Sequence, residues 1–205
     1  VSTVISSVLP GLPLTPGGIA FDAADNLYFS EQRSNRVWRI GASDGVVVSV
    51  AGTGSRGYGG DGGLATSAIL NEPGALRFDA DGNLLIAEPG NLRVRKVTMA
   101  TGIITTIAGT GECCGDADDG QLANASRLAY PSGIAVDRNR NVYIADRSNR
   151  VRKVDVAGVI TTIAGNRNGG YSGENVLASN ASLQIPSSVA VDSQGNVFFT
   201  EEEGY

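Results

Sequence analysis

A unit of about 57 residues recurs in order along nearly the whole chain, and this repeat constrains the fold more than any other feature of the sequence. Its four copies begin at Pro16, Pro73, Pro131 and Pro186 and read PGGIAFDAADNLYFSE, PGALRFDADGNLLIAE, PSGIAVDRNRNVYIAD and PSSVAVDSQGNVFFTE. In the first three copies RVWRI, RVRKV and RVRKV follow, and then VVVSV, IITTI and VITTI. β-Branched and aromatic residues dominate these runs and no helical period is sustained, so each complete unit predicts four short strands.

The four strands of a unit differ in the burial that their composition predicts. The first and second strands are nearly continuous apolar runs, which indicates cover on both faces. The third and fourth strands mix in Arg, Lys, Ser and Thr, which predicts more exposure to solvent. A sheet that is dry near one edge and wetter near the other fits radial packing around an axis. We therefore expect an all-β fold, a β-propeller of four-stranded antiparallel blades.

Composition narrows the range of functions. The 205-residue chain contains no histidine, which excludes Ser-His-Asp and Cys-His catalysis and histidine-ligated metal sites from these residues. No apolar run approaches the roughly 18 residues that a membrane span needs. A net charge of −5 provides no basic footprint for DNA. RNA is disfavoured as a partner too, because the arginines are interleaved with acids and stacking aromatic residues are few.

The unit also carries a family pattern. Its residues PxG[IL]A[VF]DxxGN[LV]Y[IF]A[DE], followed by NxRVRKV, resemble the NHL repeat. The AGTG, GDGG and AxL segments between units are similar to its long-insert variety. The resemblance covers almost all of the chain and implies a propeller, commonly a ring of six blades. It does not imply one activity, because a fold is not a function.

The repeat predicts about three and a half blades of a larger ring, and we expect further blades of a longer protein, or self-association, to cover the open sheet edges. The expected division is the last strand of a preceding blade in residues 1–9, complete blades in 15–51, 73–109 and 131–165, the first two strands of a further blade in 186–205, and long inter-blade loops in 52–72, 110–130 and 166–185.

One face of such a propeller collects the long loops together with the connections between second and third strands, because antiparallel strands alternate in direction. Binding sites often lie on long loops over a rigid scaffold, so we expect a protein or glycan partner here. The recurring acids and arginines form either a ring of charge that selects this partner or pairs that hold the turns, and their recurrence favours the second reading. Candidates on this face are Glu31, Arg33, Arg36, Arg56, Tyr58, Arg93, Arg147, Arg150, Arg167, Tyr171, Glu201, Glu202 and Glu203.

The second long loop carries an acidic cluster and both cysteines. Glu112, Asp116, Asp118 and Asp119 could hold Ca²⁺, although the EF-hand spacing is absent and a solvated loop is favoured. No other cofactor is expected. Cys113 and Cys114 are adjacent, and a strained disulfide between them, two free thiols and a bridge to another chain are all open.

Two N-x-Ser motifs place candidate glycan acceptors, Asn124 and Asn180, at what the repeat makes equivalent positions of successive loops. In a eukaryotic secreted protein both would be plausible glycan sites, and otherwise they are polar loop residues. The low lysine content, glycine-rich loops and acidic balance favour an extracellular or cell-surface protein.

Together these features predict a non-catalytic scaffold that binds a protein or a glycan. A structural subunit of an extracellular assembly is the first alternative. The second is a metal-dependent lyase or hydrolase whose site lies in blades outside this sequence, since related propellers of the gluconolactonase and amidating-lyase types do chemistry at an axial metal commonly bound by histidine.

Overall fold

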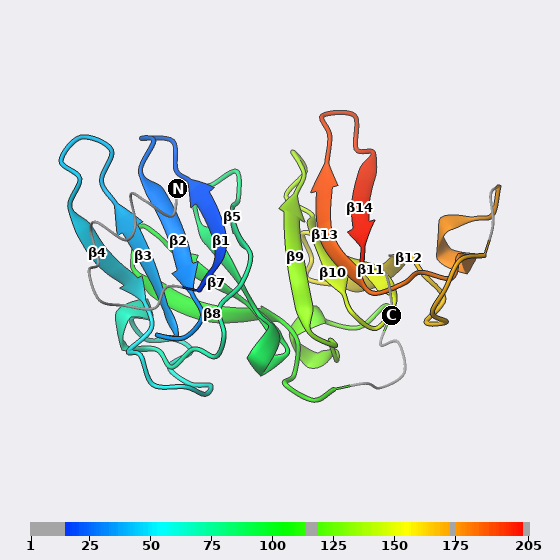
Figure 1. Ribbon diagram of the computed structural model, residues 1–205, viewed down its shortest axis with the longest axis horizontal. Helices are drawn as coiled ribbons and strands as arrows, with labels where there is room; N and C mark the ends of the chain where they lie inside the picture. The colour runs from blue at the N-terminus through cyan, green and yellow to red at the C-terminus, as the bar shows by residue number, and fades with distance from the viewer. Residues whose placement is uncertain (1–14, 114–118, 173–174, 203–205) are drawn as a thin grey trace.

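The computed structural model describes residues 15–113, 119–172 and 175–202, so the strand expected in residues 1–9 lies outside it. The described chain forms three four-stranded antiparallel sheets and one two-stranded sheet (Figure 1). The strands are β1 (Pro16–Phe21), β2 (Leu27–Glu31), β3 (Arg36–Ile40) and β4 (Val47–Ala51) in the first sheet, β5 (Leu76–Phe78), β6 (Leu84–Glu88), β7 (Arg93–Thr98) and β8 (Ile103–Ala108) in the second, β9 (Pro131–Val136), β10 (Val142–Asp146), β11 (Arg150–Val154) and β12 (Ile160–Ala164) in the third, and β13 (Pro186–Val191) and β14 (Val197–Glu201) in the fourth.

The short turn between the first and second strands has the same construction in all four sheets. In the first sheet Asp22 Oδ1 accepts a hydrogen bond from the backbone of Asn26 at 3.0 Å, and Asp22 Oδ2 accepts from the Asn26 side chain at 2.8 Å. Such side-chain bonds to nearby backbone explain why Asp and Asn delimit these turns. The same pair recurs at Asp79–Asn83, Asp137–Asn141 and Asp192–Asn196.

Each long connection closes onto the sheets that it joins. A short 3-10 turn, η1 (Ala65–Ser67), η3 (Ala123–Ala125) or η4 (Ala178–Asn180), lies in each of them. The residue before η1, Leu64, forms an antiparallel bridge with Ile103 of the following sheet, and Leu122 forms one with Val159. The second half of these connections therefore seals the gap between neighbouring sheets.

The innermost strands pack side by side, since β1 contacts β5, β5 contacts β9 and β9 contacts β13. Their approach is close enough that a Cβ atom on Gly133 would lie 2.7 Å from Ser188 Cα. Apolar side chains fill the space between sheets, as where the Tyr28 and Phe78 rings meet edge to face at 4.9 Å between centroids. Sheets fanned out in this way from neighbouring first strands make the fold a β-propeller. In Figure 1 the short turns of the first and fourth sheets lie at the top, the first two long connections lie at the bottom and the third lies at the right.

Two expectations about burial were wrong. The third strand is not the wetter one, because Arg95 in β7 and Arg152 in β11 are fully buried, each with acidic partners. The first strand is not always covered on both faces, because Ile19 and Phe21 in β1 are 47% and 58% exposed. The described residues place no sheet against that side of β1, so its apolar side chains meet solvent.

Candidate functional site

The long connections and the turns between second and third strands lie on one side of the molecule, here called the loop face. An acid ends the second strand of every sheet and binds the segment that leads into the first strand of the same sheet. Glu31 Oε1 accepts from Thr15 N at 3.0 Å, and Glu88 Oε2 accepts from Asn71 N at 3.2 Å. Asp146 and Glu201 accept likewise from Ala129 N and Gln184 N. These acids act as clamps within their blade, and Glu31, Glu88 and Asp146 are buried.

An asparagine in the same turn ties one blade to the next. Asn35 Oδ1 accepts a hydrogen bond from Glu72 N at 3.1 Å, and Asn149 Oδ1 accepts from Ile185 N at 3.0 Å. Asn35 and Asn149 have φ angles of 50° and 60°, in the left-handed region that Asn tolerates better than most residues. Leu92 occupies this left-handed position in the second sheet, with φ 54° and no side-chain acceptor.

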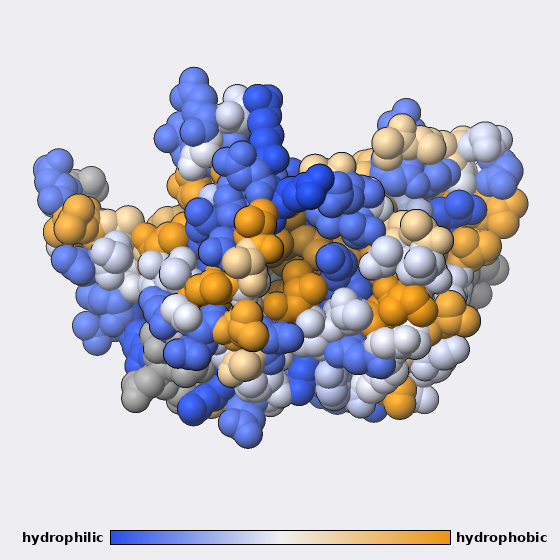
Figure 2. All heavy atoms as spheres, turned by 180° about the vertical axis from the view of Figure 1, so that it is seen from behind, coloured by the Kyte–Doolittle hydropathy of each residue, from blue (hydrophilic) through white to orange (hydrophobic). Residues whose placement is uncertain are grey.

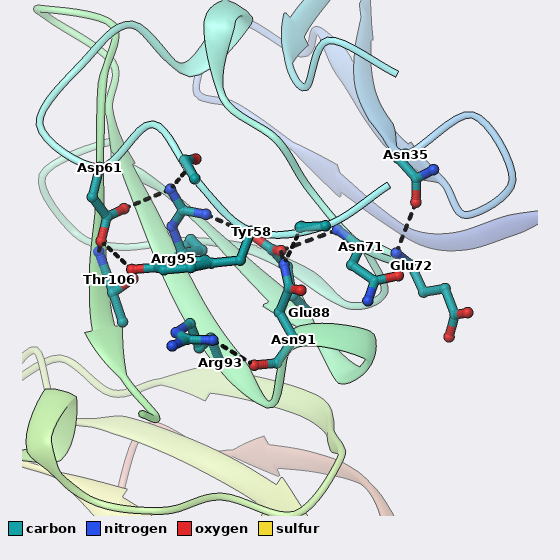
Figure 3. Close-up of polar contacts among 12 residues, drawn as sticks. Asn35, Tyr58, Asp61, Asn71, Glu72, Glu88, Asn91, Arg93, Arg95 and Thr106 are labelled. Atoms are coloured by element: carbon teal, nitrogen blue, oxygen red, sulfur yellow. Dashed lines mark hydrogen bonds and ion pairs between the residues drawn. The ribbon is translucent and has the colours of Figure 1, made fainter. Parts of the chain in front are cut away.

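A buried charge cluster surrounds Arg95 beneath the loop face (Figure 3). One guanidinium nitrogen, Nη2, lies 2.5 Å from Asp61 Oδ1, and the other, Nη1, lies 3.4 Å from Glu88 Oε1. Asp61 Oδ2 in turn accepts from Thr106 N at 3.0 Å and from the Tyr58 hydroxyl at 3.0 Å. The cluster therefore braces the glycine-rich part of the long connection against β7 and β8.

The two acids of this cluster respond differently to burial. Burial raises the pKa of Glu88 to about 7, although the charge of Arg95 and the hydrogen bond from Asn91 oppose the rise. Burial also acts to raise the pKa of Asp61, but hydrogen bonds from Thr106 and the charge of Arg95 outweigh it and lower that pKa below its ordinary value. Asp61 thus stays ionised beside Arg95 at neutral pH, whereas Glu88 gains or loses its proton near neutral pH.

The third blade repeats the cluster and the first blade does not. Arg152 Nη2 lies 2.8 Å from Asp119 Oδ1, and its Nη1 lies 3.7 Å from Asp146 Oδ2. Burial raises the pKa of Asp146 as it does that of Glu88. Trp38 takes the place of the arginine in β3, and the guanidinium of Arg36 lies 5.8 Å from the centre of its ring.

Two of the predicted binding residues meet in a cleft between the first and second blades. The cleft has a volume of about 350 Å³ and is lined by Thr15, Gln32, Arg33, Asn35, Arg56 and Glu72. Arg56 is held there by Glu72 at 2.9 Å and by Asn71 Oδ1 at 2.9 Å. Within the described part of the chain, the Arg33 guanidinium has no hydrogen bond or ion pair.

Tyr58 and Arg93 form a second surface feature beside the Arg95 cluster (Figure 3). The Arg93 guanidinium carbon lies 3.7 Å from the centre of the Tyr58 ring, a cation–π stack, and Tyr58 remains 44% exposed. Arg93 also donates to the carbonyls of Asn91 and Thr110. The stack lines a cavity of about 390 Å³ with Asp61, Thr106 and Asn124 among its walls.

The remaining candidates are spread over the loop face. Arg36 donates to the Thr53 carbonyl, and Arg147 pairs with Glu202, the residue after β14. Arg150 is 4% exposed and lies 3.8 Å from Asp146, so this arginine, like Glu31, offers no surface to a partner. Arg167 and Tyr171 are exposed and each has an interaction within the chain. Glu201 is exposed, and Glu203 lies outside the described residues.

The acidic and cysteine-containing loop is only partly described. Asp119 is engaged by Arg152 and by Thr162 N at 3.0 Å, so it serves as a structural brace like Asp61. Glu112 is exposed, while Asp116, Asp118 and Cys114 fall outside the described residues. No group of three or more acids, cysteines or histidines among the residues described is placed to hold a metal ion. Cys113 is disulfide-bonded.

The two glycan-acceptor candidates are not at equivalent positions. Asn124 is the middle residue of η3, whereas Asn180 is the last residue of η4. Five residues separate each turn from the following proline, and the N-x-Ser motif itself begins seven residues before Pro131 but six before Pro186. Both asparagines are exposed.

Sequence reasoning missed the residue immediately before the proline that opens each later repeat. Glu72, Tyr130 and Ile185 have φ angles of 52°, 51° and 47°, which is unusual for non-glycine residues and most of all for β-branched Ile. Tyr130 is 52% exposed on the loop face. The signal was present in the sequence, because each of these residues is the one variable side chain directly before the proline that opens a repeat.

Known proteins share this repeat. A family model, the teneurin NHL domain, matches residues 100–171. NHL repeat-containing protein 2 of Gallus gallus is 34% identical over 112 residues, which are 50% of this chain and 15% of that protein. Teneurin-m of Drosophila melanogaster is 33% identical over 97 residues, 42% of this chain and 4% of that protein. The chain carries the NHL repeat of these proteins on a propeller fold.

Solved structures share the fold of this NHL chain. A structural genomics protein from Bacteroides thetaiotaomicron matches with a TM-score of 0.71 and 22% identity, over 91% of this chain and 44% of that one. A streptogramin B lyase matches with a TM-score of 0.60 and 16% identity, over 93% and 50% of the two chains. Identities this low show the propeller fold alone, and the NHL chain spans half or less of each of these proteins. Nowhere in its described part is there a helix with the length and apolar character to cross a membrane.

Proposed function

We propose that this NHL chain is a non-catalytic scaffold that binds a protein or glycan partner through its loop face. The observation that supports it is that the charged residues which recur in the repeat differ in burial and bonding from one that does not recur. The recurring acids and arginines, such as Glu88, Arg95 and Arg152, are buried and bonded to one another. Arg33 departs from the repeat and lines a cleft of the same face, and no residue in the described ranges pairs with its guanidinium.

The cleft between the first and second blades favours a partner group with negative charge. Arg33 and Arg56 supply two guanidinium groups and Glu72 supplies one carboxylate, so the lining has a net positive charge. Guanidinium groups bind carboxylates in a paired geometry that is both strong and directional. We infer that an acidic side chain or an acidic sugar of the partner occupies this cleft.

A paired set of variants tests the proposal. A tagged form of the chain is screened against panels of extracellular proteins and of glycans, and each hit is retested with Arg33→Ala/Arg56→Ala and with Arg140→Ala. Arg140 is an exposed arginine paired with Asp81 at the opposite, short-turn side. We expect the double variant to lose at least ten-fold in affinity and Arg140→Ala to bind as wild type. Hits that bind both variants equally well would refute this placement of the site.

An extracellular or cell-surface location is part of the proposal. The teneurin relatives and the two exposed N-x-Ser asparagines, Asn124 and Asn180, support it. Expression through a eukaryotic secretory pathway should yield a product whose mass falls in two steps when Asn124→Gln and Asn180→Gln are introduced in turn. An unchanged mass would show that neither asparagine carries a glycan.

A role as a structural subunit is the second candidate. It is supported by large apolar side chains exposed on the first and last sheets, Phe21 and Phe198, each 58% exposed. Light scattering over a concentration series tests it, because association through these faces gives a mass that rises with concentration and that falls back with Phe21→Ser or Phe198→Ser.

An enzymatic role has less support. One of the matched structures is a catalytically inactive virginiamycin B lyase with a histidine replaced by alanine. The 205 residues of this chain contain no histidine that could take such a part.

A further inference from the structure

A groove of about 450 Å³ lies between the second and third sheets, away from the cleft of Arg33. Its apolar lining includes Leu85, Ile107, Val142 and Val154, and its polar lining includes Asp79 and Lys96. The two short turns of the third blade and one of the second border it, so it opens toward the short-turn side rather than the loop face. In the view from behind, hydrophobic and hydrophilic residues alternate over the middle of the molecule, where these two sheets meet (Figure 2).

One aromatic ring of the repeat is missing beside this groove. Leu85 in β6 occupies the position that Tyr28 holds in β2 and Tyr143 holds in β10. The registers agree, since Tyr28 pairs with Arg39, Leu85 with Lys96 and Tyr143 with Lys153. Both tyrosines are buried, at 3% and 5% exposure, and their rings pack in the core shared with the following sheet.

The facing strand is smaller as well. Phe78, which meets the ring of Tyr28 across the first gap, is replaced across the second gap by Val136. Two side chains of the second gap are therefore smaller than their counterparts in the first. Of these two, Leu85 lines the groove and Val136 does not, and the volume of the groove lies in the range of small-molecule pockets.

A polar group is missing along with the ring. The Tyr28 hydroxyl donates to Asp22 Oδ2 at 3.2 Å, and the Tyr143 hydroxyl donates to Asp137 Oδ2 at 3.0 Å. The corresponding atom, Asp79 Oδ2, accepts only from Asn83 Nδ2 at 3.0 Å among the residues described. It thus keeps a lone pair where the corresponding aspartates of the first and third blades receive a phenolic proton.

A cation lies beside this acceptor. Lys96 stands at the position of Arg39, and in the described part of the chain its ammonium group makes no ion pair or hydrogen bond. The groove therefore offers an apolar floor, a carboxylate acceptor and an unpaired cation in the arrangement that surrounds a tyrosine side chain in the first blade.

We propose that this groove is a binding site for a small phenol. The ring lies on Leu85 and Val142 in the space that a tyrosine side chain fills in the neighbouring blades. The hydroxyl group donates its proton to Asp79 Oδ2 and accepts from the Lys96 ammonium. No covalent step is involved, and the site is independent of any partner of the loop face.

Binding of p-cresol, the side-chain analogue of tyrosine, to the 205-residue chain tests the site by isothermal titration calorimetry and by ¹H–¹⁵N chemical shifts. We expect saturable binding of one molecule per chain, with the largest shifts at residues 79–85 and 154–158. Toluene has the same ring without the hydroxyl, and we expect it to bind at least five-fold more weakly.

Variants supply the matched controls. Leu85→Tyr places the missing ring in the groove and should abolish p-cresol binding, and Leu85→Phe, which adds the ring alone, should do the same if the first variant does not fold. Tyr143→Leu makes the corresponding vacancy in the third blade and should raise the stoichiometry from one to two. An absence of saturable binding, undiminished binding by folded Leu85→Tyr or Leu85→Phe, or equal affinity for toluene would overturn the proposal.

Discussion

The side-chain oxygen of Asn35 lies 3.1 Å from the backbone nitrogen of Glu72, and this hydrogen bond joins the turn of one blade to the entry of the next. Both residues are in the left-handed region, with φ of 50° and 52°. Asn35 thus has two properties at once, an acceptor and a tolerance of positive φ.

Replacement of Asn35 separates these two properties. Asn35→Gly keeps the backbone freedom and loses the acceptor, so we expect a loss of about 1 kcal/mol in the free energy of unfolding. Asn35→Ala loses both and should cost about 1 kcal/mol more, because alanine is disfavoured at positive φ. Urea denaturation of both variants measures the difference. Equal losses would show that the left-handed backbone is not a constraint here.

Removal of Arg95 should be far more costly than removal of an exposed arginine. At pH 8, Arg95→Met leaves Asp61 and Glu88 without their buried partner, and we expect a loss of about 3–5 kcal/mol. Arg140→Met breaks an ion pair in which both side chains are half exposed or more, and should cost less than about 1 kcal/mol. Adding Glu88→Gln to Arg95→Met should recover part of the loss, and no recovery would place the cost on Asp61 and on packing rather than on Glu88.

Stability should depend on pH through Glu88. The unfolded chain releases this proton near pH 4.5 and the folded chain retains it to about pH 7, so the folded state binds more protons between these values. The free energy of unfolding therefore falls by up to about 3 kcal/mol as the pH rises through this window. Asp61 acts in the opposite sense, since its lowered pKa gives stability that is lost only as the pH falls below about 3.8.

Glu88→Gln isolates this dependence. Urea denaturation between pH 4.5 and 8 should show the falling limb in wild type and in the exposed-site control Glu112→Gln, and a flatter profile in Glu88→Gln. A profile for Glu88→Gln that is as steep as that of wild type would assign the dependence to another group.

Close packing of the innermost strands should make Gly133 irreplaceable. A Cβ atom there would meet Ser188 Cα at 2.7 Å, and backbone cannot move aside as a side chain can. We expect Gly133→Ala to cost about 1–3 kcal/mol, the usual range for overpacking. Gly74→Ala is the matched control, because the nearest atoms to its Cβ would be those of Pro89 at 3.6 Å, an ordinary van der Waals distance. Thermal unfolding of the two variants tests whether the inner strands are this tightly spaced.

The strands and turns could be predicted from the repeat because hydrophobic pattern and Asp–Asn turns are local properties. The burial of Arg95 and Arg152 could not, since it depends on Asp61 and Asp119, which are distant in sequence and arrive through the long connections. The exposure of Phe21 could not either, because a strand's own composition does not tell which surface faces it. For the candidate site, the recurrence of the acids correctly suggested that they hold turns. The same emphasis on recurring residues overlooked Tyr130, because the residue at this position differs from one repeat to the next.

The acid that ends each second strand binds the segment leading into its own blade. The asparagine in the turn after that acid binds the segment leading into the following blade. A segment cut just before its opening proline thus keeps the asparagine bond whole, and its clamping acid accepts from a backbone N–H of the preceding segment, which any residue except proline supplies. We expect that whole repeats could be exchanged between such proteins without redesign of the junctions. The second repeat has Leu92 in place of the asparagine, so we expect it to be held least firmly to the blade that follows.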